Sequence, residues 1–149
     1  MGNVGDSRAV LSRGEGEAVQ LTVEHVPSKA IERASVEMRG GFVSTFPGDI
    51  SRVDGRLGLA RSFGDGPFKK HVTAKPDIYD TAIYSAGKLV VLGSNGLWAT
   101  VHNQECVDLA RRTLRSMSPE VAATQLAVLA QDRGSNDDIS CIVIAFREL

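Results

Sequence analysis

Short apolar segments alternate with glycine-rich turns along the first part of the chain. Residues 3–11 and 18–22 are rich in apolar side chains and predict two strands. The turn between them, at 13–16, contains two glycines, which favours a hairpin. A further strand is expected over 41–44. The dipeptide Asp54-Gly55, flanked by apolar residues, is a strong signal for another tight hairpin turn.

A helix is predicted over residues 29–39. Ala30, Ala34 and Met38 recur at every fourth position, the spacing that forms one stripe along a helix. The glycine pair at 40–41 is then expected to end the helix, because glycine readily adopts the left-handed conformation that follows a last helical turn.

Two further helices are expected in the second half of the chain. Asn103 is a suitable cap for a helix that extends to about residue 115. Ser118 is also a good capping residue, and a proline follows it at the first helical position. A helix is therefore predicted to begin there and to run to Arg133, with Gly134 as its stop.

Two uninterrupted apolar runs, 88–92 and 139–146, are typical of strands that are buried on both faces. Strands joined by hairpins, together with two neighbouring helices, predict an α+β fold in which the helices pack on a largely antiparallel sheet. The length of 149 residues is that of one ordinary domain, so a single unit over residues 1–149 is expected.

Composition narrows the possible function classes. The chain is 42% hydrophobic and 23% charged, a globular mixture that argues against disorder. Its formal net charge of −1 gives no electrostatic reason to expect a nucleic acid or an anionic membrane as partner. No apolar stretch approaches the roughly 20 residues of a membrane helix, and no signal-peptide core is recognisable. We therefore expect an intracellular protein, cytoplasmic or nuclear.

Acidic and amide residues are concentrated in tight turns at predicted strand ends. These turns are Gly5-Asp6-Ser7, Gly64-Asp65-Gly66, Ser94-Asn95-Gly96 and the segment 134–138. Oxygen donors of this kind suit a hard cation such as Mg²⁺ or Mn²⁺. The same residue types are also simply those that make turns. Composition and spacing leave both interpretations open.

Other standard constellations are absent from the sequence, which has no HExxH, CxxC, P-loop or nucleophile-elbow motif. Several conspicuous side chains have a structural interpretation that is simpler than a functional one. We expect Trp98 to be a packed anchor, Arg8 and Arg61 to form ion pairs, His25 to hydrogen-bond a loop, and Cys106 and Cys141 to be buried thiols.

Six short motifs follow one another along nearly the whole chain. They read NVGDSRAVL at 3–11, LTVEHVP at 21–27, GGFV at 40–43, RVDGRL through ARSFGD at 52–65, SNGLW at 94–98, and RGS with DDI at 133–139. In wording and order they resemble motifs of the PP2C family, the metal-dependent protein serine/threonine phosphatases. The stretch 40–55 is most similar to plant-type members.

The resemblance implies a PP2C-like α-β-β-α sandwich, in which two antiparallel sheets are flanked by helices and a two-metal centre lies at one end. It also implies Mg²⁺ or Mn²⁺ as the cofactor and a phosphoprotein as the partner. In this family two ions bridge a water, lower its pKa and direct it at the phosphorus of phosphoserine or phosphothreonine.

Individual positions can be carried over from the resemblance. Asp137 matches the family's C-terminal metal-ligating aspartate, and Asp6 matches an aspartate associated with an additional metal. Asn95 stands where the family has a metal-ligating aspartate, and Ala99 replaces a second nearby carboxylate. An asparagine oxygen can still bind a hard cation, but it carries no negative charge. Asp138 replaces an asparagine and is interpreted as a turn residue.

The resemblance covers only the C-terminal portion of the family's domain, so the sandwich is expected to be incomplete at its N-terminus. The half with the metal-bridging aspartate and the phosphate-binding arginine has no counterpart in residues 1–149. With Asn95 included, at least two negative charges are missing from a site for two dications. Each lost contact at about 4 Å corresponds to about 4 kcal/mol at an effective dielectric constant of about 20, before hydration offsets part of it.

We therefore expect phosphatase activity to be absent or severely reduced, with at most one weakly bound cation at Asp137 and Asp6. The alternative is a non-catalytic pseudophosphatase that binds a protein partner. A missing half would leave apolar strand faces and a sheet edge uncovered, and such surfaces favour association with another chain.

Overall fold

The structure is a computed structural model, and it describes residues 1–82 and 89–146. The chain divides into two compact units, and it passes from one to the other after Asp6, after Val23 and after Ile78. The first unit consists of Met1–Asp6 and Glu24–Ile78, and the second begins with Ser7–Val23 and continues from Tyr79.

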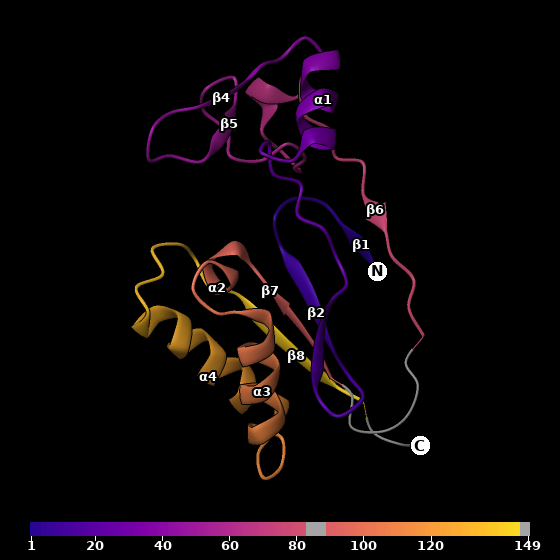
Figure 1. The fold of residues 1–149 in the computed structure, drawn as a ribbon, viewed down its shortest axis with the longest axis vertical. Coiled ribbons are helices and arrows are strands. Elements are labelled where there is room, and N and C mark those ends of the chain that lie inside the picture. Colours follow the sequence, from indigo (N-terminus) through magenta and orange to yellow (C-terminus); the bar gives the residue numbers. More distant parts are fainter. Residues whose placement is uncertain (83–88, 147–149) are drawn as a thin grey trace. The chain divides into compact units, whose positions relative to one another are not determined.

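The second unit is built on a four-stranded antiparallel sheet with the strand order β3-β2-β7-β8 (Figure 1). Its strands are β2 (Arg8–Arg13), β3 (Glu17–Gln20), β7 (Leu89–Gly93) and β8 (Cys141–Ala145). The predicted hairpin between the first two is confirmed, and the amide of Gly16 closes the turn by donating to the carbonyl of Arg13 at 3.0 Å.

Three helices follow in this unit: α2 (Asn95–Trp98), α3 (Asn103–Thr113) and α4 (Pro119–Asp132). The bounds of α4 agree with the prediction, and the Ser118 hydroxyl accepts a hydrogen bond from the Val121 amide at 3.4 Å. Helix α3 begins one residue earlier than a cap at Asn103 would allow, because His102 occupies the cap position. The short helix α2 lies where only a turn was predicted.

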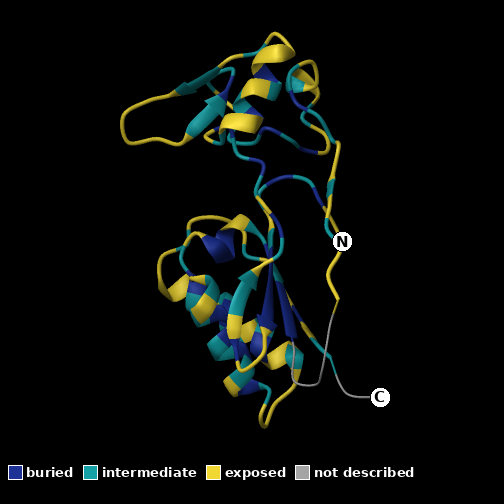
Figure 2. Cartoon of the chain, turned by 45° about the vertical axis from the view of Figure 1, so that its right-hand side comes forward, coloured by how far each residue is buried: buried dark blue, intermediate teal, exposed yellow. Residues whose placement is uncertain are grey.

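The core of the second unit joins one face of the sheet to α3 and α4. The buried side chains include Val10, Val91 and Val143 from the sheet and Val107, Ala110 and Leu126 from the helices. In Figure 2, the buried parts of these strands and helices are dark blue. None of the described helices has both the length and the apolar composition that crossing a bilayer requires.

Strand β8 is not buried on both faces, so that part of the prediction over 139–146 is wrong. Val143 is buried against the helices, but the side chains of Ile142 and Ile144 are 57% and 40% exposed. The reason is position: β8 is an edge strand that pairs only with β7, and the helices cover one of its faces. The predicted run of apolar residues therefore includes an exposed apolar surface.

The first unit has short elements and a small core. Its helix α1 (Ala30–Met38) accompanies two two-stranded antiparallel sheets, β1–β6 and β4–β5. The strands are β1 (Gly2–Asn3), β6 (Asp77–Ile78), β4 (Val43–Thr45) and β5 (Ser51–Val53), and a 3₁₀ turn, η1, spans Gly66–Phe68. One cluster of buried apolar side chains in this unit consists of Val36, Val53, Ala60 and Val72.

Helix α1 is placed where the sequence predicts it, but its stripe of Ala30, Ala34 and Met38 is not the buried face. Met38 is 82% exposed, and the buried side chains are Glu32 and Val36. The glycine pair at 40–41 ends the helix as predicted, with the amide of Gly41 donating to the Val36 carbonyl at 3.1 Å.

Two predicted strand features are corrected in this unit. The expected strand over 3–11 is interrupted, because Gly5 adopts a φ of +98° and separates β1 from β2. The Asp54-Gly55 turn forms with positive φ at both residues, 51° and 70°. Its second arm makes only one bridge, between Val53 and Leu57, so the strand partner of β5 is β4 instead.

Candidate functional site

The turn before α2 is joined to the segment that follows α4, which brings residues far apart in the sequence together. The Ser94 hydroxyl donates to the Asp138 carbonyl at 2.9 Å and accepts from the Ser140 amide at 2.9 Å. The Ser135 hydroxyl donates to the Gly96 carbonyl at 2.7 Å. These side chains clamp the two segments into one loop pair within the second unit.

Gly96 allows the closest approach in this loop pair. A β-carbon at this position would lie 2.5 Å from the carbonyl oxygen of Asp138 and 3.0 Å from that of Asp137. Backbone atoms cannot move aside as a flexible side chain can, so the position requires glycine. The start of α2 is thereby held against the backbone on either side of the Asp137 carboxylate.

The side chains of Asn95 and Asp137 contact each other across the loop pair. The Asn95 amide Nδ2 donates to Asp137 Oδ2 at 3.4 Å, and Asp137 Oδ1 accepts from the Asp138 amide at 2.8 Å. Both residues are exposed. The pair therefore presents one carboxylate and one neutral amide, and the amide donates a proton toward the oxygen that a cation would otherwise contact.

Trp98 anchors the other end of α2, as expected from the sequence. Its indole Nε1 donates to the Gly93 carbonyl at 2.9 Å and to the Arg8 carbonyl at 3.2 Å. The Arg8 guanidinium lies 5.2 Å from the ring centroid and donates to Asn103 Oδ1 at 2.7 Å. These contacts fix α2 relative to the sheet and give both side chains a structural role.

Arg133 fixes the last turn of α4, from which the Asp137 segment departs. Its guanidinium donates to both carboxylate oxygens of Glu105, at 2.6 and 2.5 Å, and to the Thr100 carbonyl at 3.0 Å. The hydrogen bond from Arg133 lowers the pKa of Glu105. The pair joins the end of α4 to the first turn of α3.

In the first unit, the turn that precedes Asp6 is bound on both sides by one histidine. The Gly5 amide donates to Nδ1 of His25 at 3.2 Å, and the His25 amide donates to the Gly5 carbonyl at 2.9 Å. The same carbonyl accepts from Asn3 Nδ2 at 3.4 Å. His25 is 1% exposed, so it hydrogen-bonds a loop from within the unit, as the sequence predicts.

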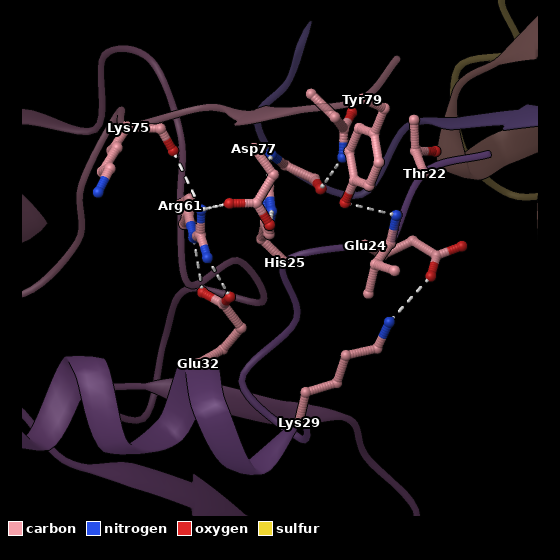
Figure 3. Close-up of polar contacts among 12 residues, drawn as sticks. Thr22, Glu24, His25, Lys29, Glu32, Arg61, Lys75, Asp77 and Tyr79 are labelled. Atoms are coloured by element: carbon pink, nitrogen blue, oxygen red, sulfur yellow. Dashed lines mark hydrogen bonds and ion pairs between the residues drawn. The ribbon is translucent and has the colours of Figure 1, made fainter. Parts of the chain in front are cut away.

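A chain of charged side chains continues from His25 (Figure 3). Its Nε2 lies 3.1 Å from Asp77 Oδ2, and Arg61 donates to Asp77 Oδ1 at 2.7 Å. Arg61 also donates to both oxygens of Glu32, at 2.9 and 2.6 Å, and to the Lys75 carbonyl at 3.2 Å. Arg61 first and His25 second lower the pKa of Asp77, and Glu32 first raises the pKa of Arg61. The predicted ion-pair role of Arg61 is confirmed.

The two cysteines are unreactive thiols. Both are free, and burial raises the pKa of Cys106 to about 12 and that of Cys141 to about 11. Thiolates are therefore scarce at neutral pH, and neither residue has the environment of a nucleophile or a metal ligand. The expectation of a buried thiol is confirmed for Cys106, whereas Cys141, at the start of the edge strand β8, is only partly buried.

The candidate ligands are distributed over both units. Asn95 and Asp137 lie together in the second, whereas Asp6 belongs to the first, so a shared ligand role for Asp6 and Asp137 stays a prediction. Residues 1–82 and 89–146 contain no group of three or more His, Cys, Asp or Glu side chains arranged to hold a metal ion. Asn95 and Asp137 together present one carboxylate and one amide as possible oxygen donors to a hard cation.

Comparison with known proteins decides the family. The profile described as "Protein phosphatase 2C" matches residues 1–139. This chain belongs to the protein phosphatase 2C family. Among curated relatives, it is 50% identical to probable protein phosphatase 2C 44 of Oryza sativa subsp. japonica and 49% identical to probable protein phosphatase 2C 10 of Arabidopsis thaliana. Both alignments cover 97% of this chain but only 44% and 49% of the relatives.

Solved structures support the same phosphatase 2C fold. A phosphatase from a pathogenic strain of Toxoplasma gondii matches with a TM-score of 0.87 and 33% identity over 98% of this chain and 47% of that one. A Caenorhabditis elegans sex determining protein matches with a TM-score of 0.82 and 26% identity over 94% and 35%. The chain thus spans about half the length of the relatives that it matches.

Sequence reasoning missed the residues that hold the candidate ligands in place. The sequence around Ser94 indicates only a turn, and nothing next to Gly96 indicates that a backbone lies against it. Glu32 is an acidic residue in a predicted helix, and its own position gives no sign of a buried partner. The motif order alone could have indicated Ser94 and Gly96, because both belong to the segment that the resemblance places at the metal site.

Proposed function

We propose that this chain is a protein phosphatase 2C family member whose hydrolysis of phosphoserine and phosphothreonine is absent or severely reduced. The supporting observation is the Asn95–Asp137 contact, in which a neutral amide donates a hydrogen bond at 3.4 Å to the carboxylate. A pair of dications needs several anionic oxygens. This pair supplies only one.

Asp137, Asn95 and Ala99 would contribute differently to the binding of an ion. When bound, Mg²⁺ or Mn²⁺ lowers the pKa of a coordinated water and offsets charge on a phosphoryl oxygen. Asp137 would supply an anionic oxygen from the clamped loop pair. Asn95 would have to turn its amide to present oxygen in place of the donating nitrogen, and Ala99 supplies no ligand. The substrate class, phosphoserine or phosphothreonine in proteins, is carried over from the family.

The direct test measures phosphate release from a phosphothreonine peptide by the purified chain with Mn²⁺. We expect the unchanged chain to be no faster than Asp137→Ala. Calorimetric titration with Mn²⁺ should give at most one weak site, which Asp137→Ala removes. Robust turnover that requires Mn²⁺ and disappears in Asp137→Ala, or two tight sites, would contradict the proposal.

A gain-of-binding variant sharpens this test. Asn95→Asp replaces the amide donor by a second carboxylate beside Asp137, and two like charges at this separation favour a cation between them. We expect tighter Mn²⁺ binding. Asn136→Asp adds the same charge one residue from Asp137 and is the matched control. Equal gains in both variants would mean that net charge, not the Asn95–Asp137 geometry, limits binding.

The alternative proposal is a non-catalytic module that binds a phosphoprotein or another protein. It is favoured by the exposed Ile142 and Ile144 on the edge strand β8. Proximity labelling in cells can test it by comparing the chain with the double variant Ile142→Thr/Ile144→Thr. The control is Ile31→Thr, which changes an exposed isoleucine on α1. An unchanged set of labelled proteins in the double variant would refute this alternative.

A further inference from the structure

In the first unit, Gly5 and Asp77 are each hydrogen-bonded to the ring of His25. Each lies within two residues of a point where the chain passes between the two units. His25 is the middle member: its Nδ1 is 3.2 Å from the Gly5 amide and its Nε2 is 3.1 Å from Asp77. One buried ring therefore ties together, inside the first unit, segments that are distant in the sequence.

The hydrogen bonds define which tautomer of the His25 ring is present. A backbone amide can only donate, so Nδ1 of His25 must accept through its lone pair. The proton of the neutral ring is then on Nε2, which donates to the Asp77 carboxylate. The two bonds are coupled, because the acceptor at Nδ1 requires the donor at Nε2.

The orientation of the His25 ring is fixed by the charged side chains that bind its partner, Asp77. Asp77 is held by Arg61, and Arg61 is held by both oxygens of Glu32, whose side chain is only 6% exposed. A carboxylate whose second oxygen is already bound has little freedom to rotate away from the histidine. Helix α1, through Glu32, thus contributes to the position of His25.

The backbone of Gly5 depends on this arrangement. Its φ of +98° is a conformation that side-chain-bearing residues rarely adopt, and both its amide and its carbonyl are bonded to His25. Asp6 follows immediately. The direction in which Asp6 leaves the turn is therefore set by the Gly5–His25 pair.

We propose that His25 is a positioning residue: through its Nδ1 it fixes the Gly5 turn, and through that turn it sets the backbone of Asp6. The link to cation binding by Asp6 rests on the family membership in the proposed function and on the metal role that the resemblance implies for Asp6, whereas the positioning of the turn does not. His25 itself contacts neither substrate nor cation in this proposal.

Two substitutions of His25 each keep one of its two side-chain hydrogen bonds and remove the other. In His25→Asn, the side-chain oxygen can take the place of Nδ1 and accept from the Gly5 amide, but no donor reaches Asp77. In His25→Gln, the side-chain nitrogen can take the place of Nε2 and donate to Asp77, but the acceptor for Gly5 is lost. A residue that merely filled space would be affected similarly by both changes.

The readouts are hydrogen exchange of the Gly5 amide and the pKa of Asp77, both followed by NMR. We expect His25→Gln to accelerate Gly5 exchange by at least about fivefold, the factor that corresponds to one ordinary hydrogen bond, and His25→Asn to change it less. Conversely, His25→Asn should raise the pKa of Asp77, and His25→Gln should leave it low. Equal effects of both variants on both readouts would overturn the proposal.

A second pair of variants applies if the His25 variants lose amide protection throughout the first unit. Asp77→Asn keeps an acceptor for Nε2, whereas Asp77→Ala removes it and releases the ring. Faster Gly5 exchange in the alanine variant alone supports the proposal, and equal exchange in the two overturns it.

Paramagnetic broadening by Mn²⁺ tests the consequence for Asp6. We expect His25→Gln, but not His25→Asn, to weaken broadening of the Asp6 amide. Equal broadening in both variants would overturn the Asp6 part of the proposal. If the unchanged chain shows no broadening at Asp6, the metal role implied for Asp6 fails, whereas the metal role of Asp137 is judged by its own test and Gly5 exchange decides the positioning role.

Discussion

Glu32→Gln is the substitution that most directly tests how the first unit is stabilised. The Glu32 side chain is buried, with both carboxylate oxygens bonded to Arg61 at 2.9 and 2.6 Å. Breaking one partner of a buried ion pair typically costs about 3–5 kcal/mol, because the remaining charge stays buried. Glutamine keeps one acceptor oxygen, which restores about 1 kcal/mol. Arg61 also keeps Asp77 as a partner, so we expect a loss of about 2–3 kcal/mol.

This loss is large relative to the apolar core of the unit. The buried apolar residues there are Val36, Val53, Ala60 and Val72. Full burial of one valine contributes about 1.5–3 kcal/mol, so the Glu32 charge is comparable to one of the valines. We therefore expect the first unit to open locally in Glu32→Gln before the second unit unfolds.

Hydrogen exchange measured residue by residue is the appropriate assay. The amides of Val53 and Val72 donate to Leu57 and Phe68 within the first unit and should lose protection. The amide of Val91, in the second unit, should not. The matched control is Glu37→Gln on the same helix, where an exposed carboxylate lies 3.9 Å from Arg33 and contributes at most about 0.5 kcal/mol. If the two variants lose equal protection, the buried network is not what holds the unit together.

Three other predictions follow from the same contacts. The pKa of Asp77 is lowered by Arg61 and His25, so its contribution to the stability of the first unit is present above its unfolded pKa and is lost as pH falls through the lowered value. Asp77→Asn should therefore flatten the loss of Val53 amide protection below about pH 4. An unchanged pH profile would contradict this. Gly96→Ala should destabilise the second unit by about 1–3 kcal/mol in thermal melts, because the new β-carbon would lie 2.5 Å from the Asp138 carbonyl; Gly66→Ala, with open space around it, is the control, and equal melting shifts would refute the close approach. Ile142→Thr/Ile144→Thr should reduce self-association in sedimentation experiments with little change in melting temperature, and a large melting shift would mean that these side chains are packed in solution.

Local signals explain what could be predicted of the fold. The capping serine and the stop glycine delimit α4, and uninterrupted apolar residues mark β7, because these preferences act over a few neighbouring positions. The orientation of α1 could not be derived in this way. Glu32 is buried because Arg61, 29 positions away, binds it. The exposure of Ile142 likewise follows from strand order, which the strand's own sequence does not contain.

The candidate site was predictable only through the resemblance. Asn95 and Asp137 are 42 positions apart, and nothing in either turn alone indicates that they meet. The order of the motifs places Asn95 and Asp137 at the same site, and the structure shows a contact between the two side chains. The contacts of the supporting residues Ser94 and Gly96 cannot be derived from the positions next to them, because each depends on a carbonyl oxygen more than 40 positions away; only motif order places both residues at the site.

The two units hold their candidate ligand turns by different means, and this has a consequence for function. In the second unit, α2 rests on an extended apolar core, and neutral serines clamp the loop that carries Asp137. The Arg133–Glu105 ion pair at the end of α4 is partly exposed to solvent, so its loss in acid costs little. In the first, the turn that carries Asp6 is bound through His25 to a chain of ionisable groups. Apolar burial and neutral hydrogen bonds respond little to pH, whereas ion pairs are lost when a carboxylate is protonated. Acid should therefore loosen the turn at Asp6 at a pH where the serine contacts of the Asp137 loop persist.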